Sequence, residues 1–252
     1  NVQQGTYGDP FTSMTLQTAF KAIDWLRDNL EGRRPFLYCY GGEPLLNWPV
    51  VRGATFYAEN VMGQCGFQIV TNGTLIDAER AQFLACHNIF CIISIDGPPQ
   101  IHDRNRPLRN GQGSYAAVYR GLTHLKKAGG HFHLRATWAP GKGDYHRIKA
   151  HLTELAEDPL KVTVGIEFDL AGSSAIQEYA YILEDQYQSA QDNCGPLPAL
   201  TGQYLDHLLR ADLAEVPQCD AGHAAFSITP HGDIYPCQVS VSKRVFCIGN
   251  LG

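Results

Sequence analysis

The chain has 252 residues, 44% of them hydrophobic, which is enough to fill the core of one large domain with an appendage. Its 20 basic and 25 acidic side chains give a formal charge of −5 without long single-sign runs, which argues against nucleic-acid and anionic-membrane partners. No stretch approaches the roughly 20 apolar residues of a membrane helix, and no signal peptide opens the sequence. We therefore expect a cytoplasmic protein.

The apolar spacing predicts helices and strands in regular alternation along most of the chain. A helix from Thr15 to Leu30, capped by Thr15, comes first. The strands that follow are expected at 35–40, 66–71, 89–95, 131–137 and 162–170, with helices between them at about 50–62, 77–86, 115–127 and 145–155. This alternation predicts a parallel α/β sheet, either wrapped into a barrel or doubly wound. The continuous apolar runs predict strands that are buried on both faces.

The pattern changes after the fifth expected strand. Two helical stretches are expected at about 175–191 and 200–213, followed by a short hairpin that turns at Gly232. We place a domain boundary near Pro217, which gives a domain of residues 1–216 and the beginning of another at 217–252.

Small or polar residues follow three of the expected strands. The segments are Gly41-Gly42-Glu43-Pro44, Thr71-Asn72-Gly73-Thr74 and Ser94-Ile95-Asp96-Gly97-Pro98. The carboxyl ends of parallel strands are where ligands bind in α/β folds, and the Glu43 carboxylate could pair with an ammonium group. Each segment by itself is also compatible with ordinary turn chemistry, and Asp96 in particular could bind its own backbone in a turn.

Taken together and in this order, the three segments closely resemble the SAM-binding core of radical S-adenosylmethionine (SAM) enzymes. The stretch from Ser94 to Tyr115 also resembles the subfamily with an iron–sulfur SPASM extension. The resemblance implies a partial (β/α)6 barrel in which Gly41, Gly42, Glu43 and Pro44 bind the methionine amino group of SAM. It further implies that Ser94 and Arg135 face the ribose and the carboxylate of SAM. Thr71, Asn72 and Asp96 are expected in the same cofactor site.

The sequence lacks the Cys-x3-Cys-x2-Cys loop with which that family holds its catalytic [4Fe–4S] cluster. Our interpretation is that the chain begins just downstream of this loop and of the first barrel strand, so that the ligands of the catalytic cluster lie outside it. The alternative is a pseudoenzyme that has lost the motif. In either case, we expect the polypeptide as written to be unable to cleave SAM.

Cys219 and Cys237 flank the expected hairpin. Their spacing resembles the opening of the SPASM motif. The resemblance implies one or two auxiliary [4Fe–4S] clusters, with both cysteines as ligands of one cluster. The alternative is a pair of buried thiols. The other cysteines are expected to be core or loop thiols; they are Cys39, Cys65, Cys86, Cys91, Cys194 and Cys247. The histidines show no convincing metal-site spacing.

The resemblance implies an enzyme that forms a 5′-deoxyadenosyl radical and abstracts hydrogen from a peptide or protein side chain, with a donor such as flavodoxin or ferredoxin. Gln238 stands where sulfatase-maturing relatives carry an aspartate as a proposed base, so we favour thioether or other cross-link formation over formylglycine formation. The catalytic base is unassigned, although Asp96 is conceivable. Two other hypotheses are a non-catalytic peptide-binding scaffold and a barrel enzyme for a phosphorylated substrate, with residues 171–174 as a faint phosphate loop.

Overall fold

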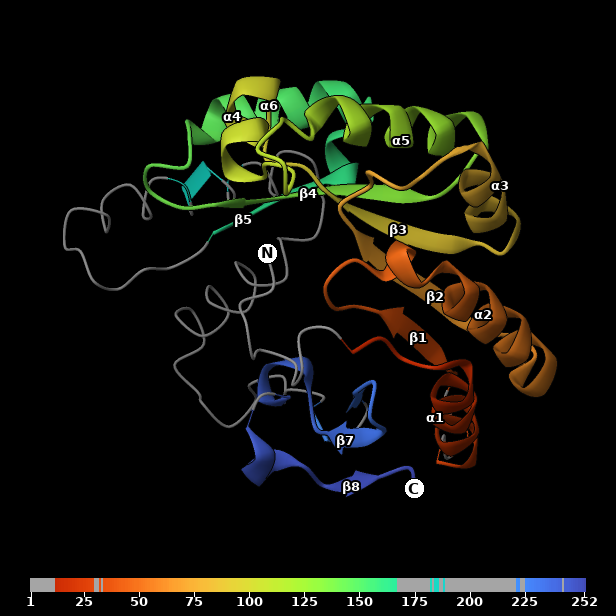
Figure 1. The fold of residues 1–252 in the computed structure, drawn as a ribbon. Coiled ribbons are helices and arrows are strands. Elements are labelled where there is room, and N and C mark those ends of the chain that lie inside the picture. Colours follow the sequence, from red (N-terminus) through yellow and green to blue (C-terminus); the bar gives the residue numbers. More distant parts are fainter. Residues whose placement is uncertain are drawn as a thin grey trace. The chain divides into compact units, whose positions relative to one another are not determined.

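The computed structural model describes residues 12–29, 32, 34–166, 182, 184–185, 188, 221–222, 225–241 and 243–252 (Figure 1). Its helices are α1 (Leu16–Asp28), α2 (Trp48–Met62), α3 (Ala78–Cys86), α4 (Pro99–Asn105), α5 (Tyr115–Lys127) and α6 (Tyr145–Ala156). Its strands are β1 (Phe36–Cys39), β2 (Gly66–Thr71), β3 (Ile89–Ser94), β4 (Phe132–Trp138), β5 (Val162–Ile166), β6 (Ser227–Ile228), β7 (Asp233–Tyr235) and β8 (Gly249–Asn250). Short 3-10 turns are η1 (Pro44–Asn47), η2 (Pro159–Lys161), η4 (Gln238–Ser240) and η5 (Arg244–Phe246).

Local capping chemistry explains several helix boundaries. The Thr15 hydroxyl accepts a hydrogen bond of 3.1 Å from the Thr18 amide at the start of α1, as the sequence predicted. Asp77 caps α3 by accepting from the Arg80 amide at 2.8 Å. Helix α4 was not predicted; it is short and begins with Pro99, whose fixed φ suits the first helical position.

The strands β1 to β5 form one parallel sheet in chain order. Phe36 of β1 pairs with Gly66 of β2, and Leu134 of β4 pairs with Val162 of β5. Burial alternates along β2, β3 and β4, so the expectation that the strands are buried on both faces was wrong among the described residues. The apolar runs conceal this alternation because the half-exposed positions of β2 and β3 include valine and isoleucine.

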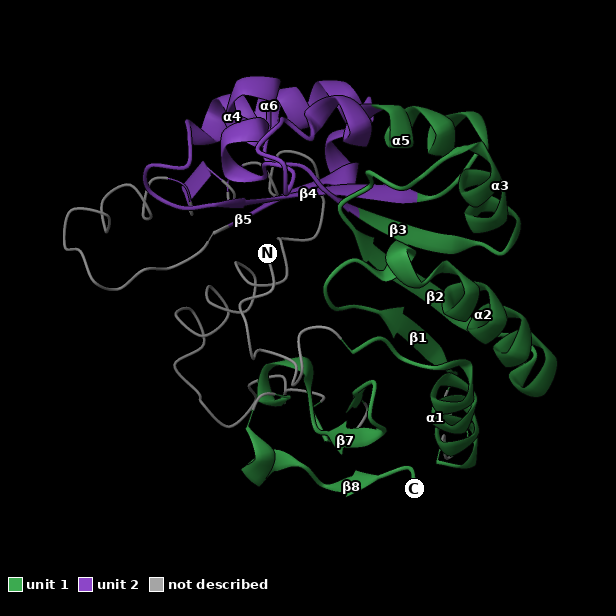
Figure 2. Ribbon diagram, viewed as in Figure 1, with its two compact units in different colours: residues 1–92, 120–131, 219–252 green, residues 93–119, 132–218 purple. Residues whose placement is uncertain are grey.

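Two compact units divide the described residues (Figure 2). Unit 1 comprises residues 1–92, 120–131 and 219–252, and unit 2 comprises residues 93–119 and 132–218. In unit 1, α1 packs on α2, where the Phe20 and Tyr57 rings stack with centroids 4.3 Å apart. In unit 2, α6 packs on β4 and β5 and buries Ile148 and Leu152. Each unit therefore has its own apolar core.

The predicted C-terminal hairpin is confirmed. Strands β6 and β7 are antiparallel, with Ser227 opposite Tyr235, and the amide of Gly232 closes the turn by donating to the Thr229 carbonyl. A third strand, β8, which the sequence did not predict, pairs with β7 and places Gly249 opposite Ile234.

Several expectations lie outside the described residues. They are the end of the fifth strand at 167–170, the phosphate-loop candidate at 171–174, most of the helix at 175–191, the helix at 200–213, Cys194 and Cys219. The predicted domain boundary near Pro217 stays a prediction. Within the described part of the chain, none of the helices combines the length and apolarity that a bilayer crossing needs.

Helix α5 packs directly against the loop that follows β2. A Cβ atom added to Gly121 would lie 2.2 Å from the carbonyl oxygen of Gly73 and 3.2 Å from the Cβ of Ile76. Replacing Gly121 by alanine should therefore displace the loop and lower the free energy of unfolding by about 1–3 kcal/mol. Chemical denaturation can measure this, with Ala117→Gly as a comparison in the same helix; an unchanged stability of Gly121→Ala would contradict the close packing.

Candidate cofactor site

Glu43 connects the ends of β1 and β2 in unit 1. Its Oε1 atom accepts hydrogen bonds from the Thr71 hydroxyl at 2.8 Å and from the Leu45 amide at 3.1 Å. Its Oε2 atom accepts from the Asn72 amide at 2.7 Å. Three donors from two segments therefore hold one carboxylate in a single orientation.

The loops on either side of Glu43 are shaped by their own residues. Gly41 has a φ of +148°, which L residues rarely adopt, and a Cβ atom there would meet no atom of the described residues within 4 Å. Pro44 begins η1, for which Glu43 is the N-cap. On the β2 side, the Asn72 side chain accepts from the amide and the hydroxyl of Thr74, at 2.9 and 2.7 Å. The backbone around the carboxylate is thus fixed, while the space beside Gly41 is open.

The Glu43 carboxylate is suited to bind a cation. Burial raises its pKa, whereas the hydrogen bonds from the Asn72 amide, the Thr71 hydroxyl and the Leu45 amide lower it. A carboxylate offers about four acceptor positions, so the three donors from the described residues leave one position on Oε2. An ammonium group, such as the one on the methionine part of SAM, matches that position in charge and in hydrogen-bonding capacity.

Asp96 is the centre of a second network, in unit 2. Its side chain, 6% exposed, accepts from Arg106 through Nε at 2.7 Å and Nη2 at 3.1 Å. It also accepts from the Thr137 amide of β4 at 3.3 Å. The expectation that Asp96 binds its own backbone in a turn was wrong, because its oxygens bind Arg106 and the Thr137 amide of a neighbouring strand.

His102 continues this network inside unit 2. Its side chain is buried, with Nδ1 accepting from the Asp96 amide at 3.1 Å and Nε2 lying 2.9 Å from the Ser114 hydroxyl. Ser114 in turn donates to the Arg106 carbonyl at 2.6 Å. Burial lowers the pKa of His102, so the neutral ring is favoured, protonated on Nε2. The imidazole therefore holds the loop after β3 rather than offering a free ligand atom.

Ser94 and Arg135, the other two expected cofactor residues, lie in unit 2 on the less buried sides of their strands. Ser94 ends β3 next to buried Ile93, and exposed Arg135 lies between buried Leu134 and Ala136 in β4. The Arg135 carbonyl accepts from the Ile95 amide at 3.0 Å. The structure thus brings together Glu43, Thr71 and Asn72 within one unit, and Ser94, Asp96 and Arg135 belong to the other.

Three of the six described thiols have properties of inert groups. Burial raises the pKa of Cys39 and of Cys65 to about 11 and that of Cys91 to about 12, so these thiols stay protonated near neutral pH. Cys237 differs. Burial acts to raise its pKa, but its hydrogen bonds with the Ser240 backbone, the Ser240 side chain and the Val239 backbone outweigh this and lower it.

No group of three or more histidine, cysteine, aspartate or glutamate side chains in the described ranges is arranged to hold a metal ion. The described residues therefore do not fit a [4Fe–4S] cluster by themselves. The expected partner of Cys237, Cys219, lies outside these ranges.

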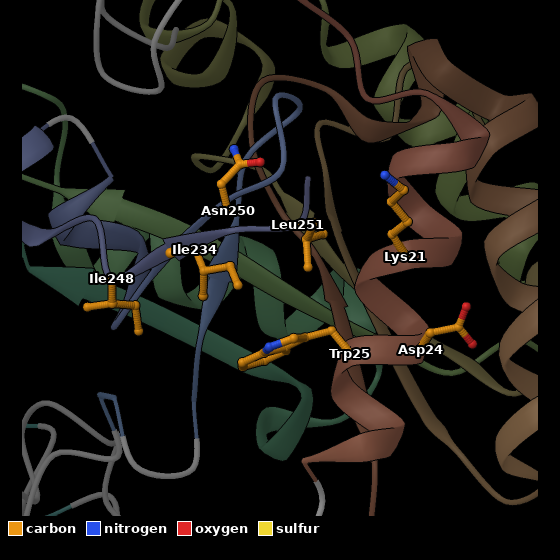
Figure 3. Close-up of a pocket in the computed structure, with 8 residues that line it drawn as sticks. Lys21, Asp24, Trp25, Ile234, Ile248, Asn250 and Leu251 are labelled. Atoms are coloured by element: carbon orange, nitrogen blue, oxygen red, sulfur yellow. The ribbon is translucent and has the colours of Figure 1, made fainter.

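A pocket of about 530 Å³ lies in unit 1 between α1 and the C-terminal strands (Figure 3). Trp25 extends from α1 toward Ile234, and Lys21 and Asp24 supply the charged groups of its lining. Both charges already have partners, since Lys21 donates to the Gly252 carbonyl and Asp24 binds the Tyr57 hydroxyl at 2.9 Å. None of the expected cofactor residues lines this pocket.

Comparison with known proteins identifies the family. The profile of the Radical SAM superfamily matches residues 3–150, more than half of the chain. The chain belongs to this superfamily. The solved structure of native anSMEcpe with bound AdoMet has a TM-score of 0.76 and 19% identity, covering 96% of this chain and 70% of that one. The expected α/β radical SAM fold is therefore confirmed.

The curated relatives are 25–41% identical to the chain over the matched residues. An uncharacterised protein, MJ0907 of Methanocaldococcus jannaschii, is 26% identical over 94% of this chain and 79% of its own length. The radical SAM cyclopropyl synthase TigE of Paramaledivibacter caminithermalis is 25% identical over 80% of this chain and 43% of its own. A serine-type anaerobic sulfatase-maturating enzyme of Bacteroides thetaiotaomicron is 41% identical over 24% of this chain and 15% of its own. The chain spans less than half the length of the two named enzymes.

Sequence reasoning missed the supporting side chains of this radical SAM core. Arg106, His102 and Ser114 were noted as part of the SPASM-like stretch but were given no role. The available signal was a segment that opens with Pro98 and Pro99, has His102 next to an apolar isoleucine, and ends with Arg106. The contact of Asp96 with Thr137 could not be read from the sequence, because the two residues are 41 positions apart.

Proposed function

We propose that this chain is the SAM-binding core of a radical SAM enzyme that modifies a side chain of a peptide or protein. The observation that carries the proposal is the Glu43 carboxylate, which is fixed by three donors and keeps one acceptor position on Oε2. That position suits the ammonium of SAM. We further propose that Gly41, Gly42 and Pro44 shape the backbone beside it.

In this superfamily, SAM supplies on one-electron reduction the radical that removes a hydrogen atom from a substrate. The role of this chain is to bind and orient SAM. Arg135 offers an exposed guanidinium on β4 that complements the carboxylate of SAM, and Ser94 offers a hydroxyl at the end of β3 for the ribose. The three thiols for the catalytic cluster would come from outside the described residues.

Peptide modification is supported by the relatives. TigE is named a cyclopropyl synthase, and anSMEcpe has been solved with AdoMet and a peptide. Within this class we favour formation of a thioether or other cross-link, because exposed Gln238 follows Cys237 and provides no carboxylate to take a substrate proton. The local match to the sulfatase-maturating enzyme supports the second candidate, formylglycine formation.

We also propose that Cys237 and Cys219 ligate an auxiliary [4Fe–4S] cluster in a SPASM extension. The lowered pKa of Cys237 supports this, since the thiolate is the form that binds iron. An electron donor such as flavodoxin or ferredoxin would be the second partner.

The test uses the complete gene product, reconstituted anaerobically with iron and sulfide and incubated with SAM and dithionite. We expect release of 5′-deoxyadenosine and more iron than one [4Fe–4S] cluster contains. A folded protein that binds SAM without releasing 5′-deoxyadenosine would instead support the non-catalytic scaffold. With a substrate peptide, an aldehyde-specific hydrazide probe separates the two reactions, because formylglycine reacts with it and a cross-link does not.

A further inference from the structure

Thr71 is the last residue of β2 and is 2% exposed. Its hydroxyl forms two hydrogen bonds of opposite direction. It donates to Glu43 Oε1 at 2.8 Å, and it accepts from the Gly73 amide at 2.9 Å. Because the amide of Gly73 can only donate, it commits the hydroxyl proton of Thr71 to the carboxylate.

The arrangement determines which acceptor of Glu43 is available. Oε1 receives two donors, and Oε2 receives only the Asn72 amide among the described residues. If the Thr71 donor were absent, the carboxylate could rotate and Oε1 would regain an acceptor position. The hydroxyl therefore determines where on the carboxylate a cation can bind.

We propose that Thr71 is a positioning residue that aims the remaining acceptor of Glu43 at the ammonium of SAM. The inference rests on the proposed function, since it assumes that Glu43 binds SAM. Thr71 was expected to touch the cofactor directly; in this assignment it acts through Glu43.

The proposal has a consequence for pH dependence. The groups that face the Glu43 carboxylate from η1 and from the loop after β2 are two backbone amides and the Thr71 hydroxyl, and no charged side chain of the described residues contributes to its pKa. Burial already raises this pKa, and the Thr71 hydrogen bond opposes the rise. Removing the hydroxyl should raise the pKa further. Only the ionised carboxyl group attracts an ammonium. On acidification, the variant without the hydroxyl should therefore lose SAM affinity at a higher pH than the unmodified protein does.

The experiment measures the dissociation constant of SAM by equilibrium dialysis between pH 5 and 8, on the complete protein reconstituted anaerobically. Thr71→Val keeps the shape of the side chain and removes the hydroxyl, whereas Thr71→Ser keeps the hydroxyl. Thr55→Val is a matched control, because Thr55 is also 2% exposed and its hydroxyl donates to the Val51 carbonyl within α2.

We expect Thr71→Val to weaken SAM binding by about 5–15-fold at pH 7.5, the effect of one lost hydrogen bond, and to move the acid-side loss of affinity to higher pH. Thr71→Ser should stay close to the unmodified protein in both properties. Thr55→Val should lower the midpoint temperature of unfolding without changing the SAM affinity or its pH dependence. If Thr71→Val does not fold, Thr71→Ala is compared with Thr71→Ser in the same way.

Unchanged affinity and an unchanged pH profile in the hydroxyl-free variant would overturn the proposal. Equal losses in Thr71→Ser and Thr71→Val would also overturn it, since they would indicate a packing role of the methyl group. If the unmodified protein binds no SAM at all, the proposed function itself fails, and this result is separate from the other two.

Discussion

Replacing Glu43 by glutamine should weaken SAM binding by about 10–100-fold. The substitution removes the negative charge that pairs with the ammonium, and a charge-assisted hydrogen bond is worth about 1.5–3 kcal/mol. It also introduces an amide NH2 group among three donors, so that one of the donors from Leu45, Thr71 or Asn72 must face another donor. Isothermal titration of the complete protein with SAM measures the loss.

Glu59→Gln is the matched control for this prediction. Glu59 lies on α2 in the same unit, and its carboxylate contacts at 2.8 Å the ring of His87, which is not one of the expected cofactor residues. We expect this variant to keep its affinity for SAM. Equal affinities in Glu43→Gln and the unmodified protein would mean that the Gly-Gly-Glu-Pro segment does not bind the ammonium.

Replacing Asp96 by alanine should lower the free energy of unfolding by about 2–4 kcal/mol. The substitution removes both hydrogen bonds from Arg106 and leaves the Thr137 amide of β4 without its side-chain acceptor. The Arg106 side chain is 32% exposed, so water compensates part of the loss. Chemical denaturation of the complete protein provides the measurement.

Asp144→Ala serves as the comparison in the same unit, because this exposed aspartate caps α6 by accepting from the Arg147 amide at 2.7 Å. Losing that cap should cost about 1 kcal/mol. Asp96→Asn, which keeps one acceptor oxygen, should fall between the two. If Asp96→Asn instead keeps its stability and loses SAM binding, Asp96 contacts the cofactor directly, as the sequence resemblance implied.

The sequence by itself determined the elements that depend on local chemistry. The period of the apolar residues predicted β2 and α5 with the bounds that the structure has, and Thr15 was predicted as the cap of the first helix. Glycines and polar residues after the strands pointed to the segments beginning at Gly41, Thr71 and Ser94. These signals act within a few residues, so a single sequence carries them.

The tertiary structure decided how those segments work together. Glu43 receives donors from residues 28 and 29 positions further along the chain, and Asp96 receives one from a residue 41 positions away. Only the pairing of neighbouring parallel strands brings such groups within hydrogen-bond distance, and the sequence does not encode that pairing as a local pattern. The sequence therefore indicated which residues form the site, whereas the sheet determined that Thr71 and Asn72 hold Glu43 and that Thr137 contacts Asp96.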